Sequence, residues 1–350
     1  MMKKLLMVTM GALTLAGCAS KGVRDGAGYD VNAADFARAT GETDDTGRLQ
    51  RAIDAASPYG VVYIPKGVWE VGSMLWVTNR ASVLMHKSAI LRATKEMDYV
   101  MALDLKAQWA LLGQKGSDAV EDYNFFVRGG QIDGNGLASC LAVDNYHHLS
   151  LNGITFLNGK KYGLRVDGRG GHGYELVASD CYFKTVIHGC KGNEAVYSTG
   201  GDSHYLDCIV VDYTIGFHFG KCGWSNHLTR CHVWGGPVRE MLDDSVNFLV
   251  EEDGCILTDC YADTGKVGFW LKANNTRLIG CFYYSNPCFK LDDIAMVRQD
   301  DGTALVSGCS FSKTAKNVKA YDHRGGKSEW RDCTYVGFDA TDEKPGELFK

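Results

Sequence analysis

Seven cysteines recur in the same short setting, with a polar or glycine residue before the thiol and a β-branched or aromatic residue close behind it. They are Cys181, Cys208, Cys231, Cys260, Cys281, Cys309 and Cys333, separated by 21 to 29 residues. Two earlier repeats carry glycine at this place, at Gly130 and Gly153. A loose repeat of roughly 25 residues around short β-forming segments is the sequence signature of a solenoid. We therefore expect a chain built from stacked, similar coils.

A parallel β-helix explains this repeat best. Each of its coils returns the chain to the same place about 4.8 Å further along the axis, so that equivalent side chains stack. A small apolar thiol suits an inward-facing corner of such a stack. An α-solenoid would need a helical periodicity of 3.6 residues, and the repeats show none. The pattern from Gly130 to Cys333 gives eight coil steps, which predicts a rod of roughly 40 Å.

A second, alternating segment follows most of these positions. Its second and fourth residues are apolar and should point inward, while its third residue points outward. The segments are Cys140–Asp144, Gly163–Asp167, Gly216–Gly220, Asn247–Glu251, Gly268–Lys272 and Cys288–Asp292, with a less clear continuation at Val318–Ala320. The coil between Cys181 and Cys208 does not align cleanly, so its register stays open. Forty-two glycines, only five prolines and no low-complexity linker favour one turn-rich, all-β domain.

The start of the chain resembles a secretory signal. Lys3 and Lys4 are followed by an apolar run that is too short to span a membrane. The run ends in Leu15-Ala16-Gly17-Cys18, which resembles a bacterial lipobox. The resemblance implies cleavage before Cys18, lipidation of its thiol and attachment to the cell envelope outside the cytoplasm; an ordinary signal peptide is the alternative. We expect a signal over residues 1–17, a tether over 18–29 and the β-helix over 30–350.

Charge and cysteine spacing bear on two classes of partner, nucleic acids and zinc. The formal charge of −5 becomes −7 without Lys3 and Lys4, so a generally basic nucleic-acid binder is excluded. Twelve cysteines remain besides Cys18, and no Cys-x-x-Cys pair points to zinc. Stacked thiols in a dry core are the simplest interpretation, and disulfides between coils stay open because the envelope permits them.

Two segments resemble a known superfamily. Ala39–Ala56, followed by Gly60–Val71, resembles the opening of the pectate-lyase-like β-helices, which include rhamnogalacturonase-like and epimerase-like proteins and phage tailspikes. Gly130–Gly136 is similar to a segment of polygalacturonase-like helices. The resemblance implies a right-handed, single-stranded parallel β-helix. It also implies an N-terminal helix, started by Asp44, Asp45 and Thr46, that caps the core, and a first strand over residues 60–71.

The same resemblance implies an enzyme that cleaves glycosidic bonds in an extracellular, acidic polysaccharide. The oligomeric state stays open, and a homotrimer is one alternative because tailspike-like relatives are often trimers. The catalytic set of the polygalacturonases is not carried over, because Gly171-His172-Gly173 stands without the Asn-Thr-Asp and Arg-Ile-Lys motifs. The calcium-dependent lyase pattern is not evident either, so calcium stays open as a cofactor. Non-catalytic glycan binding and polysaccharide epimerisation are the alternatives.

The outward residues of the second strand are the candidate binding surface. They read Ala142, Arg165, His218, Leu249, Trp270, Lys290 and Lys319, with Asp167, Glu251, Lys272 and Asp292 at the strand ends. An aromatic ring can stack on a sugar, and Arg or Lys can pair with a carboxylate or sulfate. We therefore expect Arg165, Arg239, Trp270, Lys290 and Asp292 to bind the substrate. A solvated strand face with scattered charges is the alternative.

Two segments read as insertions, over residues 235–245 and 292–302. Inserted loops on a rigid scaffold often carry active sites, and the first brings Arg239, Glu240, Asp243 and Asp244 towards His218 and Trp270. In hydrolysis, Asp243 or Asp244 would pair with Glu240, Glu251 or Asp292 as acid and base. In β-elimination, His218, Lys272 or Arg239 would be the base, and Arg165 or Lys290 would neutralise a uronate.

We select Asp243, Asp244, His218 and Lys272 as the catalytic candidates. Adjacent aspartates are also common in turns, and His218 could be structural. His147 and His148 read as residues of a turn, and Asp202 and His204 as residues of a loop.

Overall fold

The computed structural model describes residues 28–56, 59–78, 81–104, 125–168, 173–186, 192–221, 223–235, 244–286, 293–314, 318–339 and 345. Within these ranges the chain is almost all β, with a short 3-10 turn, η1 (Ala33–Asp35), and a helix, α1 (Thr46–Ala55). None of the helical segments in these ranges is long and apolar enough to cross a membrane.

The described strands form three long parallel sheets, which we name sheets A, B and C. Sheet A contains β1 (Val31–Asn32), β2 (Val61–Ile64), β5 (Ser82–Met85), β8 (Phe125–Arg128), β11 (Tyr146–Asn152), β14 (Gly173–Ser179), β17 (His204–Leu206), β20 (His227–Thr229), β23 (Ile256–Thr258), β26 (Thr276–Ile279), β29 (Thr303–Ser307) and β32 (Lys327–Arg331). Sheet B contains β3 (Gly67–Val71), β6 (Ala89–Ala93), β9 (Gln131–Asp133), β12 (Thr155–Leu157), β15 (Tyr182–Lys184), β18 (Ile209–Val211), β21 (His232–Trp234), β24 (Tyr261–Asp263), β27 (Phe282–Tyr284), β30 (Ser310–Ser312) and β33 (Thr334–Val336). Sheet C contains β4 (Leu75–Val77), β7 (Tyr99–Asp104), β10 (Ser139–Asp144), β13 (Tyr162–Asp167), β16 (Glu194–Ser198), β19 (Ile215–Phe219), β22 (Val246–Val250), β25 (Val267–Leu271), β28 (Ile294–Gln299) and β31 (Val318–His323).

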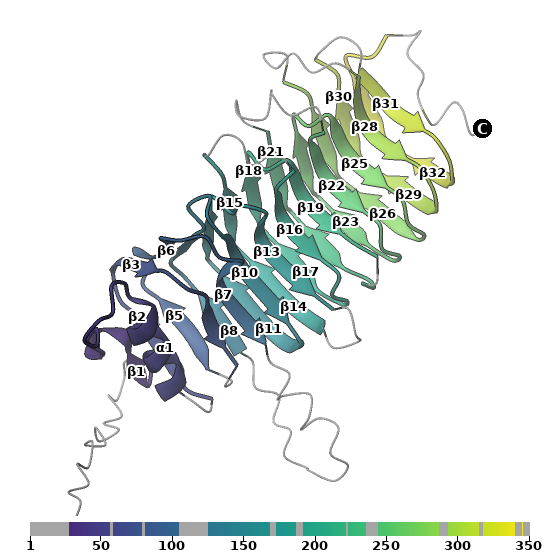
Figure 1. Ribbon diagram of the computed structural model, residues 1–350. Helices are drawn as coiled ribbons and strands as arrows, with labels where there is room; N and C mark the ends of the chain where they lie inside the picture. Colours follow the sequence, from purple (N-terminus) through teal and green to yellow (C-terminus); the bar gives the residue numbers. More distant parts are fainter. Residues whose placement is uncertain are drawn as a thin grey trace, which may run out of the picture.

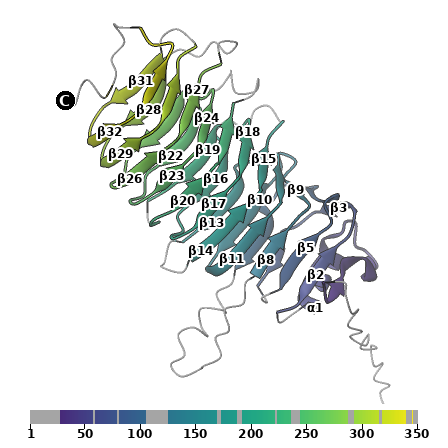
Figure 2. The ribbon, with the colours of Figure 1, turned by 180° about the vertical axis from the view of Figure 1, so that it is seen from behind.

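The chain visits sheets A, B and C in turn, and each coil lies beside the next to form an elongated stack (Figure 1). The view from behind shows the same order of strands from β2 to β31 (Figure 2). This is the right-handed parallel β-helix that the sequence predicted. From β9 to β33, sheet B advances by the eight steps expected from the cysteine spacing.

The corner between sheets A and B explains why the residue before each repeated cysteine is mostly aspartate or glycine. That residue has a left-handed backbone, with φ between 52° and 64° in all seven coils. The residues are Asp180, Asp207, Arg230, Asp259, Gly280, Gly308 and Asp332. Glycine adopts this conformation without strain, and aspartate tolerates it better than most residues. The following cysteine then turns into the core.

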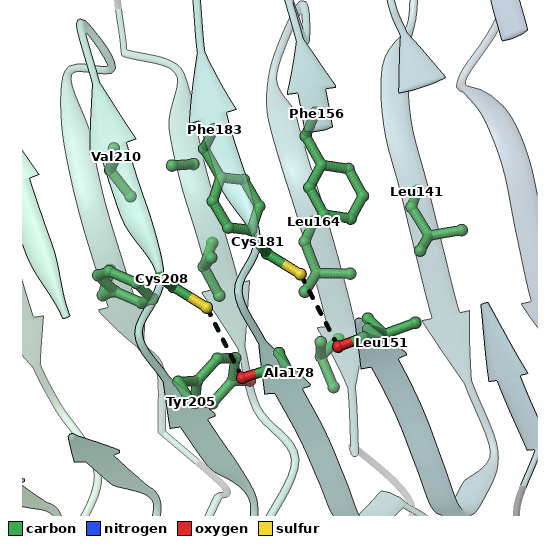
Figure 3. Packing of buried hydrophobic residues seen from close by; sticks show 14 of the residues in the cluster. Leu141, Leu151, Phe156, Leu164, Ala178, Cys181, Phe183, Tyr205, Cys208 and Val210 are labelled. Atoms are coloured by element: carbon green, nitrogen blue, oxygen red, sulfur yellow. Dashed lines mark hydrogen bonds between the residues drawn. The ribbon is translucent and has the colours of Figure 1, made fainter. Parts of the chain in front are cut away.

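The thiols at this corner contact backbone carbonyls of the preceding coil. The Cys181 thiol lies 3.8 Å from the Leu151 carbonyl oxygen, and the Cys208 thiol lies 3.6 Å from that of Ala178 (Figure 3, dashed lines). The nine cysteines of the described ranges are free thiols. Burial raises the pKa of Cys231 well above its ordinary value, so this thiol stays neutral and packs as a small hydrophobe.

Stacked aromatic rings fill much of the core. Phe156 and Phe183 stack at 4.6 Å between ring centroids. Phe248 stacks on Phe217 at 5.6 Å and on Phe269 at 5.1 Å, on the inner face of sheet C. These three phenylalanines occupy the second position of the alternating segments and are fully buried. The predicted inward alternation is therefore confirmed in these coils.

Several local expectations were wrong. His147 and His148 lie in strand β11 and not in a turn, and His204 lies in strand β17 and not in a loop. Residues 60–71 form two strands, β2 and β3, and β1 precedes them in sheet A. The segment 292–302 is not an inserted loop, because Ile294–Gln299 forms strand β28 of sheet C. Gly153 occupies the left-handed corner position, with φ 62°, and the buried Ile154 takes the place of the thiol.

The predicted N-terminal helix is present as α1, which lies at the β1–β2 end of the stack (Figure 1). Leu49, Ala52, Ile53 and the adjoining Ala56 join the main core. Asp44 accepts a hydrogen bond from the Thr46 N–H at 3.0 Å. The Asp45 side chain does not cap the helix; it accepts a 2.8 Å bond from the Glu70 N–H and holds α1 to β3.

Candidate functional site on sheet C

The outward column of sheet C differs in part from the predicted column. The register pairs Trp76, Ala102, Ala142, Arg165, Tyr197, His218, Leu249, Trp270, Arg298 and Asp322 across neighbouring strands. Arg165, His218 and Trp270 are therefore confirmed as members. Tyr197 fills the coil whose register was open. Arg298 and Asp322 replace Lys290 and Lys319, because the strand after β25 begins later than predicted.

His218 lies at the centre of this column, between two carboxylates. Its Nδ1 is 2.8 Å from Glu194 Oε2, and its Nε2 is 3.3 Å from Glu251 Oε2. The His218 side chain is 14% exposed. Burial opposes its charge, but the hydrogen bonds with Glu194 and Glu251 raise the pKa of His218 to about 9. His218 is therefore an imidazolium at neutral pH and does not suit the predicted role of base.

Glu251 also contacts Lys272, whose Nζ lies 2.9 Å from Glu251 Oε1. The hydrogen bond with His218 and the contact with Lys272 outweigh burial and lower the pKa of Glu251 to about 2. Glu251 is thus a carboxylate with one oxygen on each cation. The side chains of Glu194, His218, Glu251 and Lys272 form one charged group, which we call the central cluster.

Trp270 is half-buried and not the freely exposed ring that the sequence predicted. It packs against Val246, Leu249 and Val267. Lys272 Nζ lies 4.2 Å and Arg298 Cζ 5.1 Å from the ring centroid, both over the ring. A sugar that stacks on Trp270 must therefore displace one of these cations.

A depression of about 560 Å³ lies on sheet A, whereas two depressions lie on sheet C, one on each side of the central cluster. The first on sheet C, of about 630 Å³, is lined by Met97, Asp98, Tyr99, Ser139, Lys160, Lys161, Tyr162, Arg165 and Tyr197. Tyr162 and Tyr197 stack at 5.5 Å, and Lys161 lies 4.8 Å over the Tyr162 ring. We call it the tyrosine depression.

Arg165 is less available for a substrate anion than the sequence predicted. Its guanidinium pairs with Asp144 at 3.3 Å and also contacts Asp167. Burial, opposed by Arg165, raises the pKa of Asp144. Lys161 is a second cation at this end of the face, and its Nζ lies over the Tyr162 ring.

The second depression, of about 320 Å³, is lined by Asp244, Ser245, Val246, Lys266, Val267, Trp270, Asp293, Arg298 and Arg324. We call it the tryptophan depression. It brings Asp244 beside Trp270, as the sequence predicted. Its cationic side chains are Lys266, Arg298 and Arg324, and both arginines also pair with Asp322. The catalytic role of Asp244 stays a prediction.

Several predicted residues lie outside the described ranges. They are Cys18, Arg239, Glu240, Asp243, Lys290 and Asp292. Their proposed roles stay predictions. Sequence reasoning missed Glu194, Tyr197 and Arg298 at this face. Glu194 and Tyr197 belong to the coil without the usual glycine-apolar alternation, and Arg298 lies on β28, which begins later in the sequence than the pattern predicted.

The sequence also did not decide whether the protein binds a metal ion. In the described part of the chain, three or more His, Cys, Asp or Glu donors converge at one place, formed by His147, His148 and Glu175 on sheet A. Imidazole nitrogens are not the oxygen ligands that calcium prefers. The calcium prediction therefore gains no support from this group and stays a prediction.

No protein-family model and no curated protein matches this sequence. Several solved structures are similar to this chain. The endo-xylogalacturonan hydrolase from Aspergillus tubingensis is similar with a TM-score of 0.60 and 12% identity, over 87% of this chain and 92% of that one. The A-module of the Azotobacter vinelandii mannuronan C-5 epimerase AlgE4 has a TM-score of 0.51 and 13% identity, over 89% and 99%.

The tailspike protein of E. coli bacteriophage HK620, solved with a pentasaccharide, has a TM-score of 0.64 and 14% identity. The match covers 89% of this chain and 64% of the tailspike, so this chain spans about two thirds of that relative. Identities this low establish the fold and not the activity. The chain is a right-handed parallel β-helix protein of the architecture shared by these three structures.

Proposed function

We propose that this protein binds a polysaccharide along the outer face of sheet C and cleaves its glycosidic bonds at the central cluster. The observation that carries the proposal is the order of sites along the sheet: the tyrosine depression, then the central cluster, then the tryptophan depression. β13 and β25 are four strand steps apart, or roughly 19 Å. A polymer along the helix axis would therefore fill both depressions and cross His218 between them.

The central cluster offers the groups for two kinds of cleavage. In hydrolysis, a proton donor protonates the leaving oxygen while a carboxylate activates water. Imidazolium His218 supplies the proton, and Glu194 or Glu251 supplies the carboxylate. In β-elimination, a uronate carboxylate is neutralised by a cation while a base removes the neighbouring proton. His218 and Lys272 then serve as cations, and Glu194 as base.

An acidic glycan is the preferred substrate in this proposal. Lys160 and Lys161 line the tyrosine depression, and Lys266, Arg298 and Arg324 contribute to the tryptophan depression. The glycan-related names of the structural neighbours support a polysaccharide as partner. With the lipobox-like segment ending at Cys18, the proposal places the protein at the bacterial cell envelope, anchored by lipid.

The first experiment incubates the chain from residue 19 onward with acidic and neutral polysaccharides. New reducing ends and the ultraviolet absorbance of unsaturated sugars are followed together. Reducing ends alone would mean hydrolysis, and both signals would mean elimination. We expect His218→Gln to lower the turnover number about 100-fold or more. Tyr162→Ala should weaken binding about tenfold, whereas Trp224→Ala, an exposed tryptophan outside this face, should change neither.

Glycan binding without cleavage is the second candidate. It is favoured by the central cluster itself, because Glu194 and Glu251 already neutralise His218 and Lys272. If no polysaccharide gives either product while Tyr162→Ala still weakens binding, this second candidate replaces the first. If Tyr162→Ala and Trp270→Ala bind every polysaccharide as the unmodified chain does, sheet C is not the glycan face.

A further inference from the structure

We infer that His147, His148 and Glu175 form a binding site for a divalent transition-metal ion of the zinc type on sheet A. One ligand atom of each residue lies within 4.8 Å of the other two. His147 Nε2 is 3.4 Å from Glu175 Oε2, and His148 Nε2 contacts the same oxygen. Two imidazole nitrogens and one carboxylate thus converge on a single point.

The backbone places two adjacent histidines on the same side of the strand. Neighbouring side chains of a regular strand point to opposite faces. His148 breaks this alternation, because its φ of 51° is left-handed. The rings of His147 and His148 consequently stack, with centroids 4.3 Å apart and planes 26° apart. This arrangement turns two sequential imidazoles into a pair of converging ligands.

The third ligand comes from the next coil in register. β11 pairs with β14 so that His147 faces Tyr174 and Leu149 faces Leu176. His148 therefore lies opposite Glu175, which is also left-handed, with φ 60°. A bound ion would link two neighbouring coils of the β-helix. The site is thus built from both the local turn and the stacking of coils.

The donor set and its surroundings select the kind of ion. Two histidines and one glutamate are a known zinc ligand set that leaves one position open. That position would face the depression of about 560 Å³ that His148 and Glu175 line together with Asp202 and His204. Calcium and magnesium prefer oxygen ligands and suit this set less well. The site lies on sheet A, so it does not depend on the function proposed for sheet C.

The test uses the chain from residue 19 onward, freed of metal with a chelator and titrated with ZnCl2 in a calorimeter. We expect one zinc ion per chain. His148→Gly, chosen because glycine tolerates the left-handed backbone, and Glu175→Gln should each weaken binding about tenfold or more. His323→Ala, an exposed histidine on sheet C, is the matched control and should bind as the unmodified chain does. Zinc should also raise the melting temperature of the unmodified chain and of the control only.

Co2+ serves as the second probe, because its absorption spectrum separates nitrogen and oxygen ligands from sulfur. A spectrum without sulfur-to-metal charge transfer supports the triad. Three results would overturn the inference: no zinc binding by the folded chain, undiminished binding by both variants, or a cobalt spectrum that assigns the ion to thiols.

Discussion

His218 keeps its charge because a carboxylate lies at each of its ring nitrogens. An isolated half-buried histidine would lose its proton more easily, since burial disfavours the charged form. Here the two hydrogen bonds reverse the effect of burial. The same contacts keep Glu251 ionised. The shifted pKa values of His218 and Glu251 therefore describe one shared interaction, and their stabilising free energies are not added together.

The first prediction concerns the pH dependence of this interaction. The folded-state pKa of His218 is raised from 6.5 to about 9. Its contribution is therefore fully present below pH 6.5 and is lost as the pH rises through 9. We expect unmodified chain and His218→Gln to differ in unfolding free energy by on the order of 2 kcal/mol near pH 6, and much less at pH 10. Urea unfolding at several pH values measures this difference.

The exposed histidine variant His323→Gln is the control for that series. It should follow the unmodified chain at each pH. A constant difference between His218→Gln and the unmodified chain from pH 6 to pH 10 would mean that packing, and not the charge of His218, stabilises the central cluster.

At the residue scale, the sequence predicted the face on which a side chain lies better than it predicted the partners of that side chain. The third position of the alternating segments placed Arg165, His218 and Trp270 on the outer face correctly. It could not predict that Arg165 is paired with Asp144, because the pattern gives the face on which a side chain lies and not the partner that it contacts. The convergence of His147, His148 and Glu175 was not predicted, because the left-handed backbone of His148 and Glu175 breaks the alternation expected along a strand.

At the scale of the element, the corner between sheets A and B is the most regular feature. From β11 to β29, a left-handed residue follows each sheet A strand, and the next residue enters the core. Aspartate or glycine before cysteine is the residue pattern that this corner favours. The repeat could therefore be recognised in the sequence. β28 was misplaced because Phe289 and Leu291 have the apolar alternation of a sheet C strand in the sequence, whereas β28 begins at Ile294.

The second prediction tests the left-handed corner at Asp259, whose φ is 52° and whose side chain is exposed. Asp259→Gly should leave the unfolding free energy within about 0.5 kcal/mol or raise it slightly, because glycine tolerates this backbone. Asp259→Val should lower it by about 1–2 kcal/mol, because a β-branched residue is strained there. Thermal unfolding of both variants measures the effect, with Thr258→Val on the adjacent strand as control. Equal stability of the glycine and valine variants would contradict the strained corner.

At the scale of the whole molecule, each coil packs only on its neighbours, so the two ends of the stack expose strands and core that an inner coil would cover. At the N-terminal end, α1 contributes Leu49, Ala52 and Ile53 to the same core as β2 and β4. The family resemblance of Ala39–Ala56 implied this helix. Its role as a cap, and the number of chains in the assembled protein, stay predictions.

The last prediction tests that cap with the same substitution on two faces of one helix. Ala52 is fully buried, whereas Ala55, one turn further, is exposed. Ala52→Asp places a carboxylate without a partner in the core and should lower the unfolding free energy by about 3 kcal/mol or more. Because it also loosens the cover over the first coil, this variant should self-associate, which light scattering after size-exclusion chromatography detects. Ala55→Asp should remain as stable and as dispersed as the unmodified chain. If Ala52→Asp loses stability without associating, α1 stabilises the first coil but does not shield the end of the β-helix.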